Sequence, residues 1–108
     1  MPVFVTCLVL AVAILLAGSP ARADPQAGRL KAQMCATCHG PLGMATMPDT
    51  PNLAGQPEVY LSEQLKAYRN GKRVHDTMTL IAKPLTDDEI ASLAAWFSSL
   101  QVEVKEKP

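Results

Sequence analysis

Apolar residues recur at the spacing of one helix face in three segments of the chain, residues 25–34, 57–70 and 86–100. These stripes consist, in order, of Leu30 and Met34; Leu61, Leu65 and Tyr68; and Ile90, Leu93, Ala94, Phe97 and Leu100. No segment shows a convincing alternation of polar and apolar residues, as a half-buried strand would, and no repeat is visible. The pattern therefore predicts an all-α fold of three to four short helices.

Residues at the ends of these segments are typical of helix boundaries. Asp24 and Pro25 suit a helix start, because Asp caps free N–H groups and Pro fits the first turn. Gly71 is a suitable C-cap for the second segment. Thr86 and Glu89 have the spacing of a capping box, which predicts the start of the third helix.

Two segments between the helices are predicted to be loops. Residues 40–55 are rich in Gly and Pro and have no periodic apolar pattern. A long irregular loop in so small a domain usually wraps around something, here a bound group. Residues 74–84, which include His75 and Met78, are predicted to form the second loop.

The first 23 residues have the character of a secretory signal. Residues 3–17 form a nearly continuous apolar run, which is shorter than the roughly 20 residues that span a bilayer. Ala21 and Ala23 place small residues where a signal peptidase cleaves. No Lys or Arg precedes the run, and an uncleaved anchor helix is the alternative. We predict cleavage of residues 1–23, a periplasmic protein, and no stable membrane insertion afterwards.

Cleavage would leave 85 residues with nine basic and ten acidic side chains. This balance does not indicate nucleic-acid binding, which requires a clear basic surplus. Residues 24–101 are predicted to be one domain, and residues 102–108 a mobile charged tail. The domain would hold few aromatic residues, namely Tyr60, Tyr68, Trp96 and Phe97. So small a core is marginal by itself, which favours a buried apolar cofactor.

The main chemical signal is the stretch Cys35-Ala36-Thr37-Cys38-His39. Two thiols two residues apart, followed at once by His, form the attachment signature of a c-type haem. Cys35 and Cys38 would bond the haem, and His39 would bind the iron while its second ring nitrogen donates to a loop carbonyl. A structural zinc site needs four ligands, and two further partners are missing. Nucleophilic catalysis is disfavoured because both thiols belong to the haem motif.

The sixth ligand of the iron decides what the haem can do. Met44 and Met47 follow His39 too closely to reach the opposite face of the ring. Met78 lies beyond the second helix, and its thioether would stabilise ferrous iron in a six-coordinate centre that transfers electrons. His75 is the rival ligand and would give a lower reduction potential. We favour Met78.

Together these residues resemble the class I monohaem cytochromes c, and in particular a bacterial subgroup whose two-haem members repeat one such unit. The resemblance extends from Gly28 to Leu100. The motifs that carry it are Cys35-Ala36-Thr37-Cys38-His39-Gly40, Pro51-Asn52-Leu53-Ala54-Gly55-Gln56, Gly71-Lys72-Arg73, Met78, Leu85-Thr86-Asp87-Asp88-Glu89-Ile90, and Leu93-Ala94-Ala95-Trp96-Phe97. The resemblance implies a small cytochrome c fold wrapped around one covalently attached haem c.

The resemblance also implies roles for single residues. The carbonyl of Pro51 would accept a hydrogen bond from His39, and Met78 would be the distal ligand. Gly28 would pack against Trp96 where the terminal helices cross. A Gly within a helix costs about 1 kcal/mol relative to Ala, which independently favours a close approach there. An aromatic residue that is common in the family before the first cysteine is absent.

We therefore predict an electron carrier and not an enzyme. It would carry one electron, as a soluble carrier or as the cytochrome subunit of a periplasmic oxidoreductase. Expected partners are redox proteins that dock transiently, such as a flavoprotein dehydrogenase or a terminal oxidase. The alternative is a haem enzyme or gas binder with a labile Met78 ligand. The sequence offers no acid–base pair near the distal site, which argues against this alternative.

Overall fold

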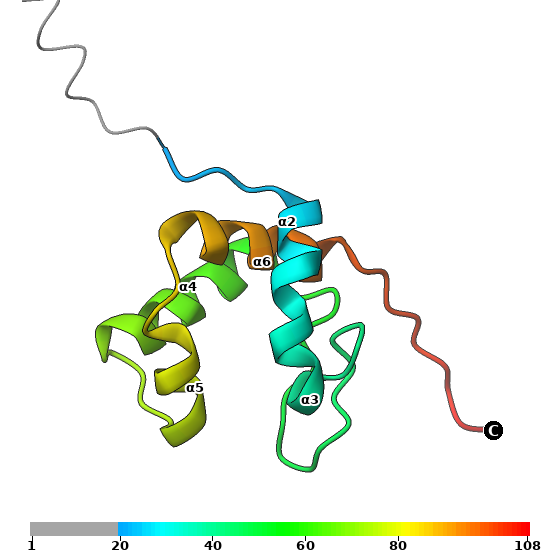
Figure 1. Ribbon diagram of the computed structural model, residues 1–108. Helices are drawn as coiled ribbons and strands as arrows, with labels where there is room; N and C mark the ends of the chain where they lie inside the picture. The colour runs from blue at the N-terminus through cyan, green and yellow to red at the C-terminus, as the bar shows by residue number, and fades with distance from the viewer. Residues whose placement is uncertain (1–19) are drawn as a thin grey trace, which may run out of the picture.

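The structure is a computed structural model, and it describes residues 20–108. This part of the chain is helical and contains no strand (Figure 1). Its elements are α2 (Pro25–Lys31), the 3-10 helix η1 (Ala32–Cys35), α3 (Ala36–His39), α4 (Glu58–Asn70), α5 (Asp76–Ala82) and α6 (Asp87–Ser99). The predicted all-α fold is confirmed.

The first predicted helix forms and continues further than expected. The side chain of Asp24 accepts a hydrogen bond from the second helical N–H at 3.0 Å, and Pro25 occupies the first turn. The residues that join α2, η1 and α3 keep right-handed helical dihedrals, so the helical segment reaches His39. It ends at Gly40, whose φ is 82°. The cysteine–histidine motif therefore lies on helix, at the end of the segment.

The crossing of α2 with α6 is the most extensive helix pairing in residues 20–108, and Figure 1 shows the two helices side by side. A Cβ atom at Gly28 would lie 1.9 Å from the carbonyl oxygen of Ser92 and 2.9 Å from Cβ of Trp96. The close approach predicted at Gly28 is confirmed, and so is its packing against Trp96. The nearest neighbour is the α6 backbone, which cannot move aside as a flexible side chain can.

The second interhelical segment differs from its prediction. Residues 74–84 were expected to form a loop, but residues 76–82 form α5. The helix begins because Nδ1 of His75 accepts a hydrogen bond from the N–H of Met78 at 3.2 Å. Its other end is anchored by Ala82, which is fully buried. The sequence did not indicate this helix, because histidine is an uncommon cap and a single small buried residue makes no periodic apolar pattern.

The predicted end of α4 and the predicted start of α6 are confirmed. Gly71 ends α4 with a left-handed φ of 82°. At the start of α6, Oγ1 of Thr86 accepts from the N–H of Glu89 at 3.1 Å, and the Glu89 carboxylate accepts from the N–H of Thr86 at 3.0 Å. The bond from the N–H of Thr86, together with the ammonium group of Lys31, holds the pKa of the Glu89 carboxyl below its ordinary value. Local signals thus determine where α4 ends and where α6 begins.

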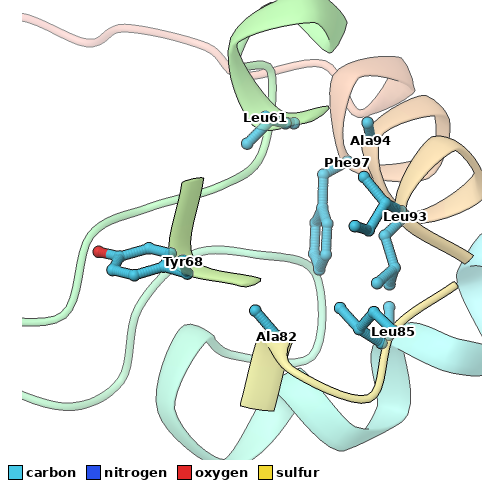
Figure 2. Close-up of a cluster of buried hydrophobic side chains, with 9 residues drawn as sticks. Leu61, Tyr68, Ala82, Leu85, Leu93, Ala94 and Phe97 are labelled. Carbon is cyan, nitrogen blue, oxygen red and sulfur yellow. The ribbon is translucent and has the colours of Figure 1, made fainter. Parts of the chain in front are cut away.

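The hydrophobic core lies where α4, α5 and α6 meet the first helical segment (Figure 2). Its buried members are Ala32, Leu61, Tyr68, Ala82, Leu85, Ile90, Leu93, Ala94 and Phe97. Only two of them are aromatic, in line with the small core expected from composition. Cys35 and Met78 pack against this cluster from its border. The core therefore touches both segments that carry candidate haem-binding residues.

The two ends of the chain leave some expectations open. Residues 3–17, the apolar part of the proposed signal, lie outside the described residues. Residues 101–108 are exposed and without regular structure, and Figure 1 shows them running away from the helices. The cleavage of residues 1–23 and the mobility of the C-terminal tail stay predictions. Within residues 20–108, no helix combines the length and the hydropathy needed to cross a bilayer.

The helix crossing yields a first prediction. Replacing Gly28 with Ala should destabilise the haem-loaded protein by about 1–3 kcal/mol, because the added methyl group would force α2 away from the α6 backbone. Denaturant unfolding measures this change in the free energy of unfolding. Gln26→Ala, an exposed substitution in the same helix, serves as the control and should leave stability nearly unchanged. A Gly28→Ala variant as stable as the parent would contradict the close contact.

Candidate haem site

His39 is the last residue of α3, and its side chain is buried. Its Nδ1 atom lies 2.8 Å from the carbonyl oxygen of Pro51. A carbonyl oxygen can only accept, so Nδ1 carries the proton and Nε2 keeps a free lone pair. This is the arrangement of a neutral histidine that is ready to bind a metal through Nε2.

The loop between α3 and α4 holds Pro51 in place. The carbonyl of Gly43 accepts hydrogen bonds from the N–H groups of Leu53 at 2.7 Å and Ala54 at 3.1 Å, which folds the loop back on itself. The side chain of Asn52 accepts from the N–H of Ala45 at 2.7 Å. A Cβ atom at Gly43 would lie 2.9 Å from the ring of Phe97, so the loop sits directly on α6. The Pro51 carbonyl, which accepts from His39, is therefore held in place by hydrogen bonds within the loop and by the packing of the loop on α6.

Cys35 ends η1, and Cys38 lies one helical turn later in α3. Both are half-buried, and no disulfide joins them. Burial raises the pKa of the Cys35 thiol to about 11, against the opposing effect of the Lys31 ammonium group. Because the thiolate is the reactive form in nucleophilic catalysis, this environment does not suit a catalytic cysteine at neutral pH. It suits a thiol that is to be buried against an apolar group.

Met78 lies in the first turn of α5 and is partly buried. α5 packs on α4, whereas η1 and α3 continue α2, and Figure 1 shows α5 and α3 well apart. Met78 and Cys35 nevertheless pack against the same core cluster. α5 thus brings the thioether of Met78, and the segment α2–η1–α3 the thiol of Cys35, to one apolar core, and His39 lies at the end of that segment. A c-type haem uses donors of these kinds, thiols for its covalent attachment and an imidazole and a thioether for its iron.

The rival ligand His75 is exposed and already engaged. Its Nδ1 atom accepts from the backbone N–H of Met78, so in the neutral ring Nε2 carries the proton. Iron binding through Nε2 would require the opposite tautomer, which cannot accept this bond. Met44 and Met47, in the loop after His39, are each about half exposed, with 46% and 48% of their surface accessible.

Some contributions to the site were not foreseen from the sequence. The capping role of His75 and the loop anchor formed by Asn52 are examples. The spacing of His75, Met78 and Thr79 could have suggested a cap, but His is not a preferred capping residue. In the part of the chain that is described, no three His, Cys, Asp or Glu side chains come together as a metal site.

The sequence profile of the family described as Cytochrome c matches residues 26–101. The chain belongs to the cytochrome c family. A relative, cytochrome c4 of Thiocapsa roseopersicina, is 43% identical over 84 residues, which cover 77% of this chain and 43% of that protein. The thiosulfate dehydrogenase electron acceptor of Stutzerimonas stutzeri is 42% identical over 69 residues, covering 61% of this chain and 32% of that protein.

A solved structure shows the same fold as this cytochrome domain. The reduced recombinant cytochrome c4 from Pseudomonas stutzeri superposes with a TM-score of 0.71 at 36% identity, and the match covers 77% of this chain and 48% of that one. The chain spans less than half the length of the cytochrome c4 proteins that it matches. The predicted cytochrome c fold is confirmed. As a member of this family the protein carries a covalently attached haem c, and Cys35, Cys38 and His39 fit the family's attachment motif.

The roles of the two thiols can be tested by mass. In the haem-loaded protein, denaturing mass spectrometry should find the haem still attached to the chain, because thioether bonds survive unfolding. A variant with both Cys35→Ala and Cys38→Ala should release all of its haem. Thr37→Ala, an exposed substitution between the two cysteines, is the matched control and should keep the haem attached. Release of haem from this control, or its retention by the double variant, would contradict the assignment.

Proposed function

We propose that this cytochrome carries one electron at a time on a haem c whose iron is bound by His39 and Met78. One observation carries the proposal. His39 has a free Nε2 lone pair. Met78 packs against the same core cluster as Cys35 of the haem motif, while His75 is engaged as a cap. His39 and Met78 would thus be the two ligands that the chain supplies to the iron. Haem supplies the one-electron chemistry, with the iron cycling between its ferric and ferrous states.

The surroundings of the two ligands suit electron transfer. The Pro51 carbonyl keeps the His39 ring in one orientation and makes it a better donor. The thioether of Met78 favours ferrous iron and raises the reduction potential. If His39 and Met78 both bind the iron, no ligand position would be left open for oxygen or peroxide. Cys35 and Cys38 would hold the ring covalently and keep its distance to both ligands constant.

The alternative is an enzyme or gas binder in which Met78 leaves the iron. Met78 is held at its backbone by His75, and its side chain packs against the core. These contacts favour a ligand that stays in place. We therefore infer an electron carrier and not an enzyme.

Its relatives suggest what the carrier exchanges electrons with. One relative is named as the electron acceptor of thiosulfate dehydrogenase, an oxidoreductase. We propose that this domain likewise accepts electrons in the periplasm from an oxidoreductase, either as a free carrier or as its subunit. A flavoprotein dehydrogenase and a terminal oxidase are the other candidate partners. Docking would be brief and small in area, as is usual for electron-transfer complexes.

Replacing Met78 with Ala tests the ligand assignment. The oxidised haem protein should lose its sulfur-to-iron charge-transfer band and its reduction potential should fall, because water or a weaker ligand replaces the thioether. Carbon monoxide should bind the reduced variant much faster than the parent. Met47→Ala, which removes an exposed thioether on the loop after His39, is the matched control and should change none of these. A Met78→Ala variant with an intact band would refute the assignment.

The carrier role can be separated from the enzyme role with the parent protein. We expect the oxidised protein to be reduced by catalytic amounts of a thiosulfate dehydrogenase with thiosulfate, or of a flavoprotein dehydrogenase with its substrate. Stopped-flow absorbance of the haem follows this reaction. We also expect slow binding of carbon monoxide and cyanide. Rapid binding of either, together with peroxide turnover, would favour the enzyme instead.

A further inference from the structure

We propose that His75 is a positioning residue, whose imidazole holds the first turn of α5 so that Met78 presents its sulfur to the iron. The inference rests on the proposed function, because it takes Met78 as the distal ligand. It gives a different role to His75, which the sequence alone offers as an alternative iron ligand to Met78. The two residues are not alternatives but neighbours joined by a hydrogen bond.

The hydrogen bonds around Met78 close this turn from two sides. Nδ1 of His75 accepts from the N–H of Met78, the third residue of α5, at 3.2 Å. In return, the N–H of His75 donates to Oγ1 of Thr79 at 3.0 Å. The N–H of Thr79 donates to the carbonyl of His75 at 2.9 Å. The backbone of Met78 is thereby fixed between two residues that also bind each other.

α5 depends strongly on this cap because the helix is short. It has seven residues, and helices of this length are not stable by themselves. The last residue of α5, Ala82, is fully buried and anchors that end. Leu80, which lies between Met78 and Ala82, is 71% exposed. Packing of Ala82 therefore secures the end of α5, whereas at its beginning the His75 cap acts together with the partial packing of Met78. Met78 lies at the end that depends on the cap.

The same chain contains a second capped helix that serves as a comparison. Thr86 caps α6 with the same kind of bond, because its side chain accepts from the third N–H of the helix. α6 has 13 residues and a buried face, and it carries no proposed ligand. Loss of the Thr86 cap should therefore lower stability without affecting the iron. This contrast separates a positioning role from a general stabilising role.

The test compares three variants of the haem-loaded protein, His75→Ala, His75→Asn and Thr86→Ala. In His75→Ala the sulfur-to-iron band should weaken and carbon monoxide should bind the ferrous protein roughly fivefold faster, because loss of the cap favours opening of the turn. His75→Asn should restore both properties, since Asn is a good capping residue. Thr86→Ala should melt at a lower temperature with an unchanged band and binding rate.

Hydrogen exchange gives a second readout that does not depend on the spectrum. The amide of Met78 should exchange roughly fivefold faster in His75→Ala, while amides in the middle of α6 keep their rates. A full band together with unchanged carbon monoxide binding in His75→Ala would overturn the positioning role. So would a failure of His75→Asn to restore them. If Met78→Ala itself leaves the band intact, the proposed ligand is wrong, which is a failure distinct from that of His75.

Discussion

The contact between the backbones of α2 and α6 at Gly28 is the constraint on which the rest of the structure depends. A side chain at this position would collide with the carbonyl oxygen of Ser92, so the helices can cross this closely only over a glycine. Because α2 continues through η1 into α3, the crossing also places Cys35 and His39 relative to the core. The haem-binding motif is thus positioned by a contact that lies two helical turns before it.

Two histidines of the chain use the same ring atom in opposite ways. Nδ1 of His39 donates to the carbonyl of Pro51, which leaves Nε2 free to bind a metal. Nδ1 of His75 accepts from the N–H of Met78, which puts the proton on Nε2. In each ring, one hydrogen bond at Nδ1 therefore decides the role: it prepares His39 as a ligand and makes His75 a cap. Because that cap bonds to Met78, both proposed axial ligands are oriented by imidazole hydrogen bonds.

Much of this arrangement could be predicted from the sequence, because it depends on local signals. Gly71 and Thr86 mark helix ends by their own chemistry, and the spacing of Cys35 to His39 identifies the haem whatever the fold. α5 was missed because it begins with a histidine cap and buries only one small residue, so no apolar stripe revealed it. The role of His75 depends on which ring nitrogen faces the Met78 amide. That is a matter of geometry, which residue spacing does not determine.

The identity of the two iron ligands is the central claim, and X-ray absorption at the iron edge of the oxidised haem protein tests it most directly. We expect a sulfur scatterer in the first coordination shell, contributed by Met78, with nitrogens from the haem and from His39 completing the shell. A first shell made only of nitrogen or oxygen would contradict it. In that case His75 or water would be the distal ligand.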